Sequence, residues 1–309
     1  MQSCAFVATW DLFAAGEEPH PLELRMIDFG STPPTPEFNP TSRTHLANYR
    51  RVYRASEDRA RIEADPKEAL RSYLAAYDEI GASKIVIKAR DVETTFGLKI
   101  RNEDVAAFCR DHAPRFIGFA GVDPHKGMAA LRELEMAVND LGLVGLNIQC
   151  FESKLAINDP KLYPLYAKCI ELDIPVNIHV GINFSTHSSM EYGRPALLDQ
   201  VMMHFPELRV VASPPGWPWV TELIGVAWRH PTVHIGLVAL RPKYLAVANS
   251  GYEPLLQFGN TVLQDRMIFG SLWPMQPVGQ AVAEIEALPI KDQTKRKWLH
   301  ENAARFLRL

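Results

Sequence analysis

Residues 144–180 read VGLNIQCFESKLAINDPKLYPLYAKCIELDIPVNIHV, and this stretch decides the fold. Its two ends, Val144–Gln149 and Val176–Val180, are short apolar runs that predict buried strands. Between them, Pro160–Leu172 follows Asp159, which we expect to cap the start of a helix. A strand, a helix and a second strand in this order indicate one parallel β-α-β unit.

The same alternation runs along the rest of the chain. Further strands are predicted at Met26–Phe29, Lys84–Lys88, Phe116–Val122, Arg209–Ala212, Val233–Leu237 and Met267–Phe269. Further helices are predicted at Pro66–Ile80, Met128–Leu141, Pro195–Phe205, Trp219–Arg229, Gly279–Ala287 and Asp292–Leu307. Strands alternating with helices in this number predict an α/β protein, a (β/α)8 TIM barrel. A doubly wound open sheet is the alternative, but no GxGxxG motif follows the first strand.

The predicted domain organisation is simple. Residues 26–309 form a single barrel domain, and residues 1–25 form an N-terminal extension, unless the start codon lies at Met26, which directly precedes the first strand. The segment Thr32–Arg61 is polar and contains PPTPEF, so we expect a long, partly helical loop. Loops of this length in compact domains usually serve as lids or contact partners.

Composition narrows the function classes. The 309 residues are 47% hydrophobic and 22% charged, which is typical of a globular protein, and the net charge is −3. There is no basic excess to bind nucleic acid or an anionic membrane, and no apolar stretch is as long as a membrane span. The four cysteines show no CxxC spacing. These features predict a cytoplasmic protein.

Polar residues gather at the predicted carboxyl ends of several strands, where TIM barrels carry their active sites. They are Asp28, Lys88, Arg90, Asn147, Gln149, Asn177 and His179. Because a buried polar group costs about 1–3 kcal/mol when it is left unpaired, we expect them to pair with one another or with a ligand. The alternatives are a binding pocket and an ordinary barrel mouth filled by water.

Several motifs resemble the amidohydrolase-related family, also called amidohydrolase 2, which includes aminocarboxymuconate-semialdehyde decarboxylase. The resemblance rests on RFIGFAGVDPHKG at 115–127, NIHVG at 177–181, RMIFGSLWP at 266–274 and WLHENAARFLRL at 298–309. It extends over nearly all of residues 26–309. The resemblance implies the same barrel fold that the strand count predicts.

The resemblance also implies a metal site, from which this sequence departs. The family usually binds one metal ion, often zinc, through two His on strand one, a His on each of strands five and six, and an Asp on strand eight. Here the corresponding residues are Gly30, Thr32, His179, Ser213 and Leu272, so one ligand of five is retained. Zinc sites use three or four protein donors, and the site is therefore degenerate. We expect no cofactor in this chain, and zinc or another divalent metal only in a paralogous partner.

Without a metal, His179 is a candidate general base or acid, with Asp28 or Ser213 as its partner. Lys88 and Arg90 are candidates to hold a substrate carboxylate. The predicted remaining substrate contacts are Asn147, Gln149, Asn177 and Trp273.

Three functions follow. The first is a non-catalytic subunit that pairs with a metal-bearing paralogue acting on a small carboxylate, in a homo- or hetero-oligomer of related barrels. The second is a metal-independent hydrolase or lyase, such as a decarboxylase, of a small carboxylated ring or lactone, with His179 as base. The third is a binding protein for a small acid.

Overall fold

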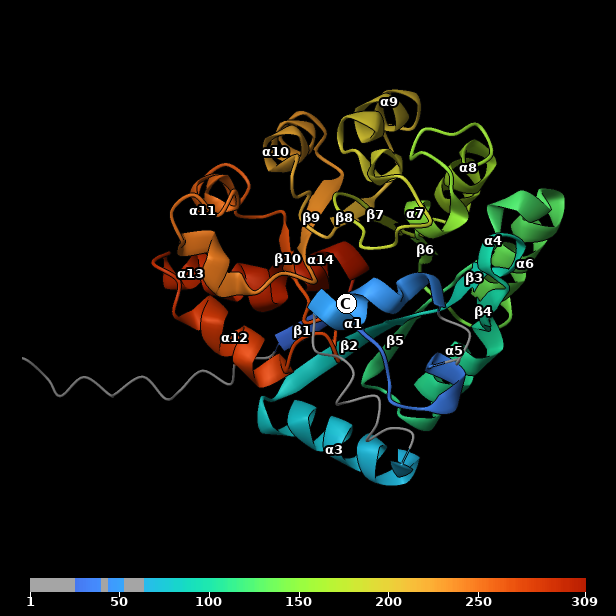
Figure 1. Cartoon of the computed structure of the whole chain (residues 1–309), viewed down its shortest axis with the longest axis horizontal. Coiled ribbons are helices and arrows are strands. Elements are labelled where there is room, and N and C mark those ends of the chain that lie inside the picture. Colours follow the sequence, from blue (N-terminus) through green and yellow to red (C-terminus); the bar gives the residue numbers. More distant parts are fainter. Residues whose placement is uncertain (1–25, 40–43, 53–63) are drawn as a thin grey trace, which may run out of the picture.

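The computed structural model describes residues 26–39, 44–52 and 64–309, so the expected extension at 1–25 lies outside the described residues. Eight parallel strands make up the centre of the molecule (Figure 1). They are β1 (Met26–Ser31), β2 (Ala82–Lys88), β5 (Phe116–Phe119), β6 (Leu146–Ile148), β7 (Val176–His179), β8 (Val210–Ser213), β9 (Val233–Leu237) and β10 (Met267–Phe269). All eight correspond to the predicted strands.

The strands pair in two runs, in the orders β1-β2-β5 and β10-β9-β8-β7-β6. Backbone hydrogen bonds join the two runs at both edges. The Leu272 N–H, just beyond β10, donates to the Gly30 carbonyl of β1 at 2.7 Å, and the Asn147 N–H of β6 donates to the Ala120 carbonyl beyond β5 at 2.7 Å. The ring is therefore closed, and the predicted (β/α)8 barrel is confirmed.

Helices surround the strands in chain order (Figure 1). The principal ones are α3 (Pro66–Glu79), α5 (Asn102–Asp111), α6 (Met128–Asn139), α8 (Tyr163–Glu171), α9 (Ala196–His204), α10 (Val220–Arg229), α11 (Glu253–Gly259) and α12 (Val278–Glu286). The C-terminal part continues through α13 (Asp292–Arg296), a π-helical turn η6 (Lys297–Glu301) and α14 (Asn302–Leu307). Their apolar faces pack on the outside of the strands, which are themselves buried.

One local expectation is wrong, and several elements were not predicted. Asp159 does not cap α8: its side chain accepts a hydrogen bond from the Lys161 N–H at 2.9 Å within the preceding turn, and the helix begins at Tyr163. The helices α5 and α11 were not predicted. A short antiparallel hairpin, β3 (Arg90–Val92) with β4 (Leu98–Ile100), also follows β2.

The inside of the barrel is packed at the amino ends of the strands. The Phe306 ring of α14 meets the Phe29 ring of β1 edge to face, with 5.9 Å between centroids, and Phe29 meets the Phe119 ring of β5 in the same way at 5.5 Å. This cluster, joined by Val211 and Ile268, fills the lower barrel. Only the carboxyl ends of the strands are left to form a cavity.

The chain after β1 crosses the carboxyl end of the barrel. Its described part contains the short helices η1 (Pro36–Phe38), η2 (Thr44–Leu46) and α1 (Ala47–Val52), which agrees with the expected partly helical loop. In Figure 1, α1 lies across the ring of strands, and Leu46 and Tyr49 line the cavity beneath it. This loop therefore forms a roof over the site.

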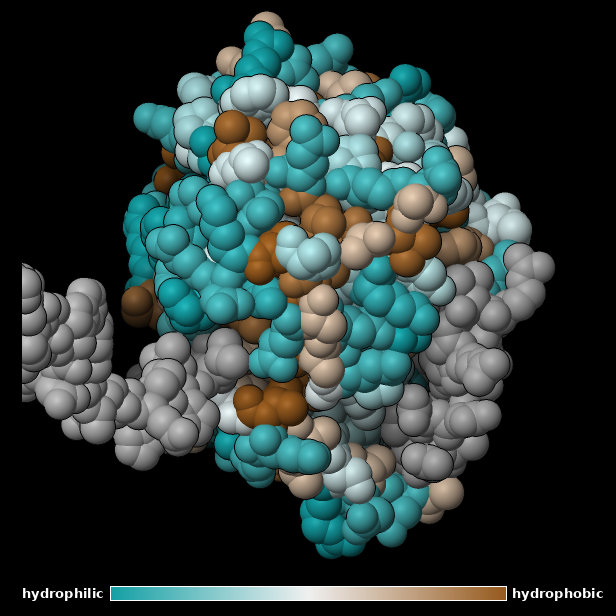
Figure 2. Space-filling model, turned by 90° about the vertical axis from the view of Figure 1, so that its left-hand side faces the viewer, coloured by the Kyte–Doolittle hydropathy of each residue, from teal (hydrophilic) through white to brown (hydrophobic). Residues whose placement is uncertain are grey.

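The outer surface alternates between polar and apolar areas. Figure 2 shows apolar side chains between hydrophilic areas on the side of the barrel that carries α11, α12 and α13. Within the described ranges, no helix has the length and the apolar character needed to span a membrane.

Candidate active site

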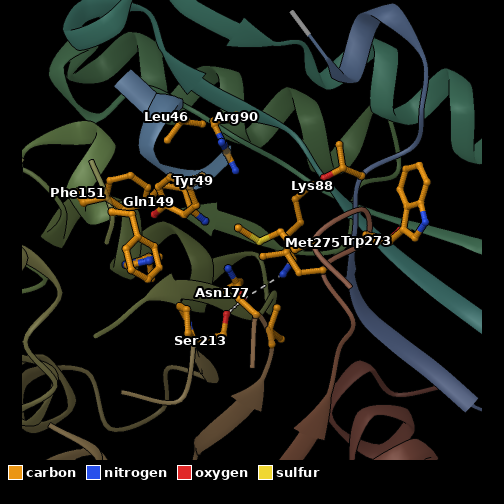
Figure 3. Close-up of a pocket in the computed structure, with 18 of the residues that line it drawn as sticks. Leu46, Tyr49, Lys88, Arg90, Gln149, Phe151, Asn177, Ser213, Trp273 and Met275 are labelled. Atoms are coloured by element: carbon orange, nitrogen blue, oxygen red, sulfur yellow. Dashed lines mark hydrogen bonds between the residues drawn. The ribbon is translucent and has the colours of Figure 1, made fainter. Parts of the chain in front are cut away.

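A cavity of about 550 Å³ lies inside the carboxyl ends of the strands, under α1. Most of its wall is apolar, and a small number of charged and amide side chains project into it (Figure 3). Its polar lining consists of Ser31, Thr32, Asn39, Tyr49, Lys88, Arg90, Gln149, Asn177, His179, Ser213 and Tyr252. A largely apolar cavity with a few converging polar groups is typical of a site for a small molecule.

A chain of amide side chains crosses the floor of the cavity. The Asn177 Oδ1 atom accepts hydrogen bonds from Ser213 Oγ at 2.9 Å and from Lys88 Nζ at 3.3 Å. The Asn177 Nδ2 group donates to Asn147 Oδ1 at 2.9 Å, which also accepts from Gln149 Nε2 at 3.0 Å. The chain fixes the orientation of the Asn177 amide, because each of its polar ends already has a partner.

Lys88 ends β2 and directs its amine into the middle of the cavity. The Nζ atom lies 4.9 Å from the centre of the Phe29 ring and 3.6 Å from the point where a Cβ on Gly30 would stand. Burial lowers the pKa of Lys88 to about 7; Asp28 opposes that shift and Arg90 adds to it. Near neutral pH, a large share of this amine is therefore uncharged.

Arg90 lies two residues farther along, and its guanidinium is tied to a buried carboxylate. Arg90 Nη1 donates to Glu152 Oε1 at 3.2 Å, while Nε has no hydrogen-bond partner among the described residues. The same carboxylate oxygen lies 2.8 Å from Nε2 of His45, in the roof of the cavity. The Arg90 side chain is 24% exposed, whereas Glu152 is fully buried. The guanidinium is thus held by Glu152 and still faces the cavity.

His179 ends β7 and lines the same cavity. Its ring lies 4.6 Å from the Phe151 ring, and its Nδ1 atom has no hydrogen-bond partner within the described part of the chain. Burial lowers the pKa of His179 to about 4, although Glu152 opposes the shift. The imidazole is therefore neutral at physiological pH, and in that form it can accept a proton.

The expected pairing of His179 with Asp28 is wrong, because Asp28 does not line the cavity. Its Oδ2 atom accepts hydrogen bonds from Tyr77 at 2.6 Å and from Ser271 Oγ at 2.5 Å, and its Oδ1 atom accepts from the N–H groups of Gly30 and Ser271. Burial raises the pKa of Asp28, and these hydrogen bonds oppose that shift. The carboxyl group connects β1 to the segment after β10 through these hydrogen bonds and so stabilises the barrel wall.

The other predicted site residues divide into two groups. Ser213, Gln149 and Trp273 line the cavity, as expected. Asn147 lies beneath it and supports Asn177. Ser213 donates to Asn177 and makes no hydrogen bond with His179 in the described structure, so the second expected partnership of His179 is also not formed.

The residues at the family's metal-ligand positions do not fit a metal ion. Gly30 and Leu272 carry no donor atom, and the Ser213 hydroxyl is engaged by Asn177. Within the described residues, no three His, Cys, Asp or Glu side chains come together in a group that could hold a metal. Because such a site needs three or four protein ligands, His179 alone is insufficient.

Sequence reasoning missed two residues of the site, Glu152 and His45. Glu152 follows β6 in the short helix α7 (Cys150–Ser153), where its position gave no sign of its ion pair. His45 lies 107 residues away from Glu152 in the sequence. The contacts of the buried Glu152 carboxylate with His45 and Arg90 form only in the tertiary structure.

Comparison with solved structures places the barrel among known ones. An uncharacterized TIM-barrel protein from Bordetella bronchiseptica is 29% identical, with a TM-score of 0.74, and the match covers 92% of this chain and 98% of that one. The 5-carboxyvanillate decarboxylase of Sphingomonas paucimobilis is 21% identical, with a TM-score of 0.64 and coverage of 93% and 99%. A dihydroxybenzoic acid decarboxylase from Polaromonas sp. JS666, solved with manganese and 2-nitroresorcinol, is 17% identical, with a TM-score of 0.64 and coverage of 92% and 97%.

These likenesses establish the fold, and the family follows from the sequence itself. No curated protein matches this chain. The family profile described as amidohydrolase matches residues 41–309, which is most of the chain and agrees with the motifs quoted above. The chain belongs to the amidohydrolase family.

Proposed function

We propose that this chain binds a small carboxylate in the barrel cavity and acts on it as a lyase or hydrolase, using its own side chains instead of a divalent metal. The observation that carries the proposal is that Lys88 and Arg90 project into the cavity (Figure 3), which the neutral imidazole of His179 also lines. Decarboxylases of aromatic acids share the fold, which is consistent with a small carboxylate as the substrate, although one of them was solved with manganese.

The electrostatics of the cavity favour an anion. Glu152 offsets the charge of Arg90 on one side of the guanidinium, and Lys88 makes its hydrogen bond to a neutral amide oxygen. A bound carboxylate beside Lys88 would favour the protonated amine, because an opposite charge raises the pKa of a lysine. Arg90 adds planar donors that match a carboxylate. The two side chains together can therefore hold an acidic substrate.

His179 supplies the proton-transfer group. A neutral imidazole can accept a proton from water, and the imidazolium formed in that step can then deliver a proton to the leaving group or to carbon after loss of carbon dioxide. Its ring is tilted against the Phe151 ring at 4.6 Å, and burial keeps the imidazole uncharged at the start of each cycle.

The test is turnover in the presence of a chelator. Purified protein treated with EDTA is offered a panel of hydroxybenzoates, lactones and oxo acids, and release of carbon dioxide or ring opening is measured. We expect chelator-resistant turnover that is lost in His179→Asn and retained in His204→Asn, a matched change on the exposed surface of α9. Turnover that disappears with EDTA and returns with manganese or zinc would contradict the proposal.

A second candidate is a non-catalytic subunit that pairs with a metal-bearing paralogue. It is favoured by the loss of donors at Gly30 and Leu272, and by the absence of a partner for His179 Nδ1 among the described residues. Purification from the native source tests it. A second barrel that carries the full ligand set and co-purifies, with activity only in the complex, supports this candidate; a homomeric and active protein rejects it.

A further inference from the structure

We propose that the Lys88 amine forms an imine with the carbonyl group of a small oxo acid bound in the cavity. The inference rests on the proposed function, because it uses the same cavity and the same carboxylate site at Arg90. It goes further by naming a covalent intermediate and a substrate class. Lys88 would then be a catalytic residue as well as a binding residue.

The surroundings of Lys88 differ from those of two half-buried lysines, Lys99 and Lys126. Lys99 and Lys126 both form ion pairs with Asp91, at 2.9 and 2.8 Å, and these pairs raise the pKa of each lysine. Lys88 forms no such pair among the described residues, and its hydrogen bond goes to the neutral Asn177 oxygen. No carboxylate among the described residues therefore holds the Lys88 amine in its protonated form.

The cavity has room for chemistry at this nitrogen because residue 30 is a glycine. A Cβ on Gly30 would stand 3.6 Å from both Lys88 Nζ and Leu272 Cδ1. A larger side chain at position 30 would enter the space that the amine now uses. The amine thus lies beside Gly30, which by resemblance corresponds to a ligand position of the family, and it faces the cavity.

The hydrogen bond to Asn177 sets the direction of the amine. Asn177 Oδ1 takes one N–H of Lys88, and Asn177 is itself held by Ser213 and Asn147. A lysine amine with a fixed N–H keeps its lone pair in a limited range of directions. Burial, which lowers the pKa of Lys88 to about 7, keeps that lone pair available near neutral pH.

The reaction balances without an oxidant or a reductant. The Lys88 nitrogen attacks the carbonyl carbon, a C–N bond forms, and the carbonyl oxygen takes up a proton. Loss of that oxygen as water leaves the imine. When the substrate is a 3-oxo acid, the carbon–carbon bond to its carboxylate then breaks, the bonding pair moves toward the protonated imine, and carbon dioxide leaves. Protonation of the resulting enamine carbon and hydrolysis of the imine return the free amine and the ketone.

Two other groups have defined tasks in this scheme. Arg90 holds the carboxylate from the side of the cavity where Glu152 anchors the guanidinium. His179, neutral and in the same cavity, carries protons between the carbinolamine, the enamine carbon and water. The substrate must therefore be short enough to place a carboxylate near Arg90 and a carbonyl near Lys88 at the same time.

Borohydride trapping tests the inference. The wild-type protein is incubated with pyruvate or acetoacetate, reduced with sodium borohydride, digested, and analysed by mass spectrometry at each lysine. We expect a reduced adduct on Lys88, its complete loss in Lys88→Arg and Lys88→Met, and its retention in Lys84→Arg. Lys84 is a matched control on the same strand, with its amine on the Pro114 carbonyl at the surface.

If the variants fail to fold, the wild-type protein alone still tests the inference, because mass spectrometry measures the adduct at each lysine separately. Absence of an adduct on Lys88, or equal labelling of Lys88 and the surface lysines, overturns the inference.

A competition experiment separates this inference from the proposed function. Benzoate, a carboxylate without a ketone, is added before trapping, and its own binding is measured by thermal shift. Benzoate that binds and blocks the Lys88 adduct supports both proposals. Benzoate that binds while no adduct ever forms overturns the imine and leaves the carboxylate site standing. An adduct that still forms at the full level in the presence of benzoate supports the imine and counts against the proposed carboxylate site.

Discussion

The Lys88 amine lies beside the vacant Cβ position of Gly30, separated from it by 3.6 Å. By resemblance to its family, position 30 is where a strand-one histidine would hold a metal. Because residue 30 on β1 is a glycine, the space beside it is open to the Lys88 side chain from the neighbouring strand β2. The residues at positions 30 and 88 are therefore coupled.

Replacing Gly30 tests this relationship. In Gly30→His, the Cβ would stand 3.2 Å from Val238 Cγ1, and the ring would compete with the Lys88 amine. Overpacking of this kind costs about 1–3 kcal/mol. We expect a lower melting temperature and loss of oxo-acid trapping, with a much smaller effect for Gly30→Ala. Trapping at the wild-type level in Gly30→His would show that the amine does not need this space.

Removing the Lys88 amine is expected to stabilise the folded protein while abolishing function. Burial lowers the pKa of Lys88 to about 7, from the ordinary value of 10.5. Between these two pH values the unfolded chain binds a proton that the folded protein does not, so wild-type stability rises with pH across this window. Lys88→Met should therefore be more stable than wild type at pH 7, and its advantage should shrink toward pH 10.

Denaturant unfolding of wild type, Lys88→Met and the surface control Lys84→Met at both pH values gives the comparison. An advantage for Lys88→Met that stays constant with pH would contradict the lowered pKa.

Asn177→Asp should alter the pH dependence of imine formation. The new carboxylate would lie about 3.3 Å from Lys88 Nζ and, as an opposite charge, would raise the pKa of the amine. Fewer amines would be neutral near pH 7, so the pH profile of borohydride trapping should move to higher pH. The variant also loses the donor to Asn147 Oδ1, although that oxygen still accepts a hydrogen bond from Gln149 Nε2.

Asn158→Asp is the control for this variant, because Asn158 bonds Gln200 at the surface. A trapping profile that does not move in Asn177→Asp, with the fold intact by circular dichroism, would rule out direct contact between this amide and the reactive amine.

Acid should destabilise the barrel partly through His234, below the active site. The His234 ring meets the Phe306 ring at 4.8 Å, its Nδ1 has no hydrogen-bond partner within the described chain, and burial lowers its pKa to about 4. As pH falls from 6.5 toward 4, the unfolded chain takes up the proton first, so stability is lost across this window. We expect a shallower loss in His234→Gln than in wild type or in the surface variant His204→Gln, followed by urea unfolding at pH 7, 5.5 and 4.5. Equal slopes would show that His234 does not contribute.

Much of the fold could be predicted from the sequence, because buried parallel strands are continuous apolar runs. The bounds predicted for β9 and β10 agree with the structure. By contrast, α5 was missed because its apolar segment Val105–Cys109 is short and has charged residues both before and after it. Its position is fixed by a tertiary contact, in which the Asn102 amide donates to the Gly121 carbonyl and accepts from the Gly121 N–H. Such contacts leave no periodic signal.

The sequence predicted at which end of the barrel the candidate site lies, but not which side chains contact one another there. Strand parity placed Lys88, Arg90, Asn177 and His179 at one end of the barrel, and all four line the cavity. The same rule placed Asp28 with them, although hydrogen bonds from Tyr77 and Ser271, 49 and 243 residues away, hold it in the wall. Alternation along a strand gives the side to which a residue points, and it cannot say which distant side chain will meet it there.

The double role of Asn177 couples two parts of the site. Its Oδ1 atom accepts hydrogen bonds from Ser213 and from Lys88, so a change at either residue acts on the other through one amide. A substitution that removes the Ser213 hydroxyl would take one donor away from this amide and loosen the partner that orients the Lys88 amine. Ser213 thus acts on the lysine indirectly, as a positioning residue.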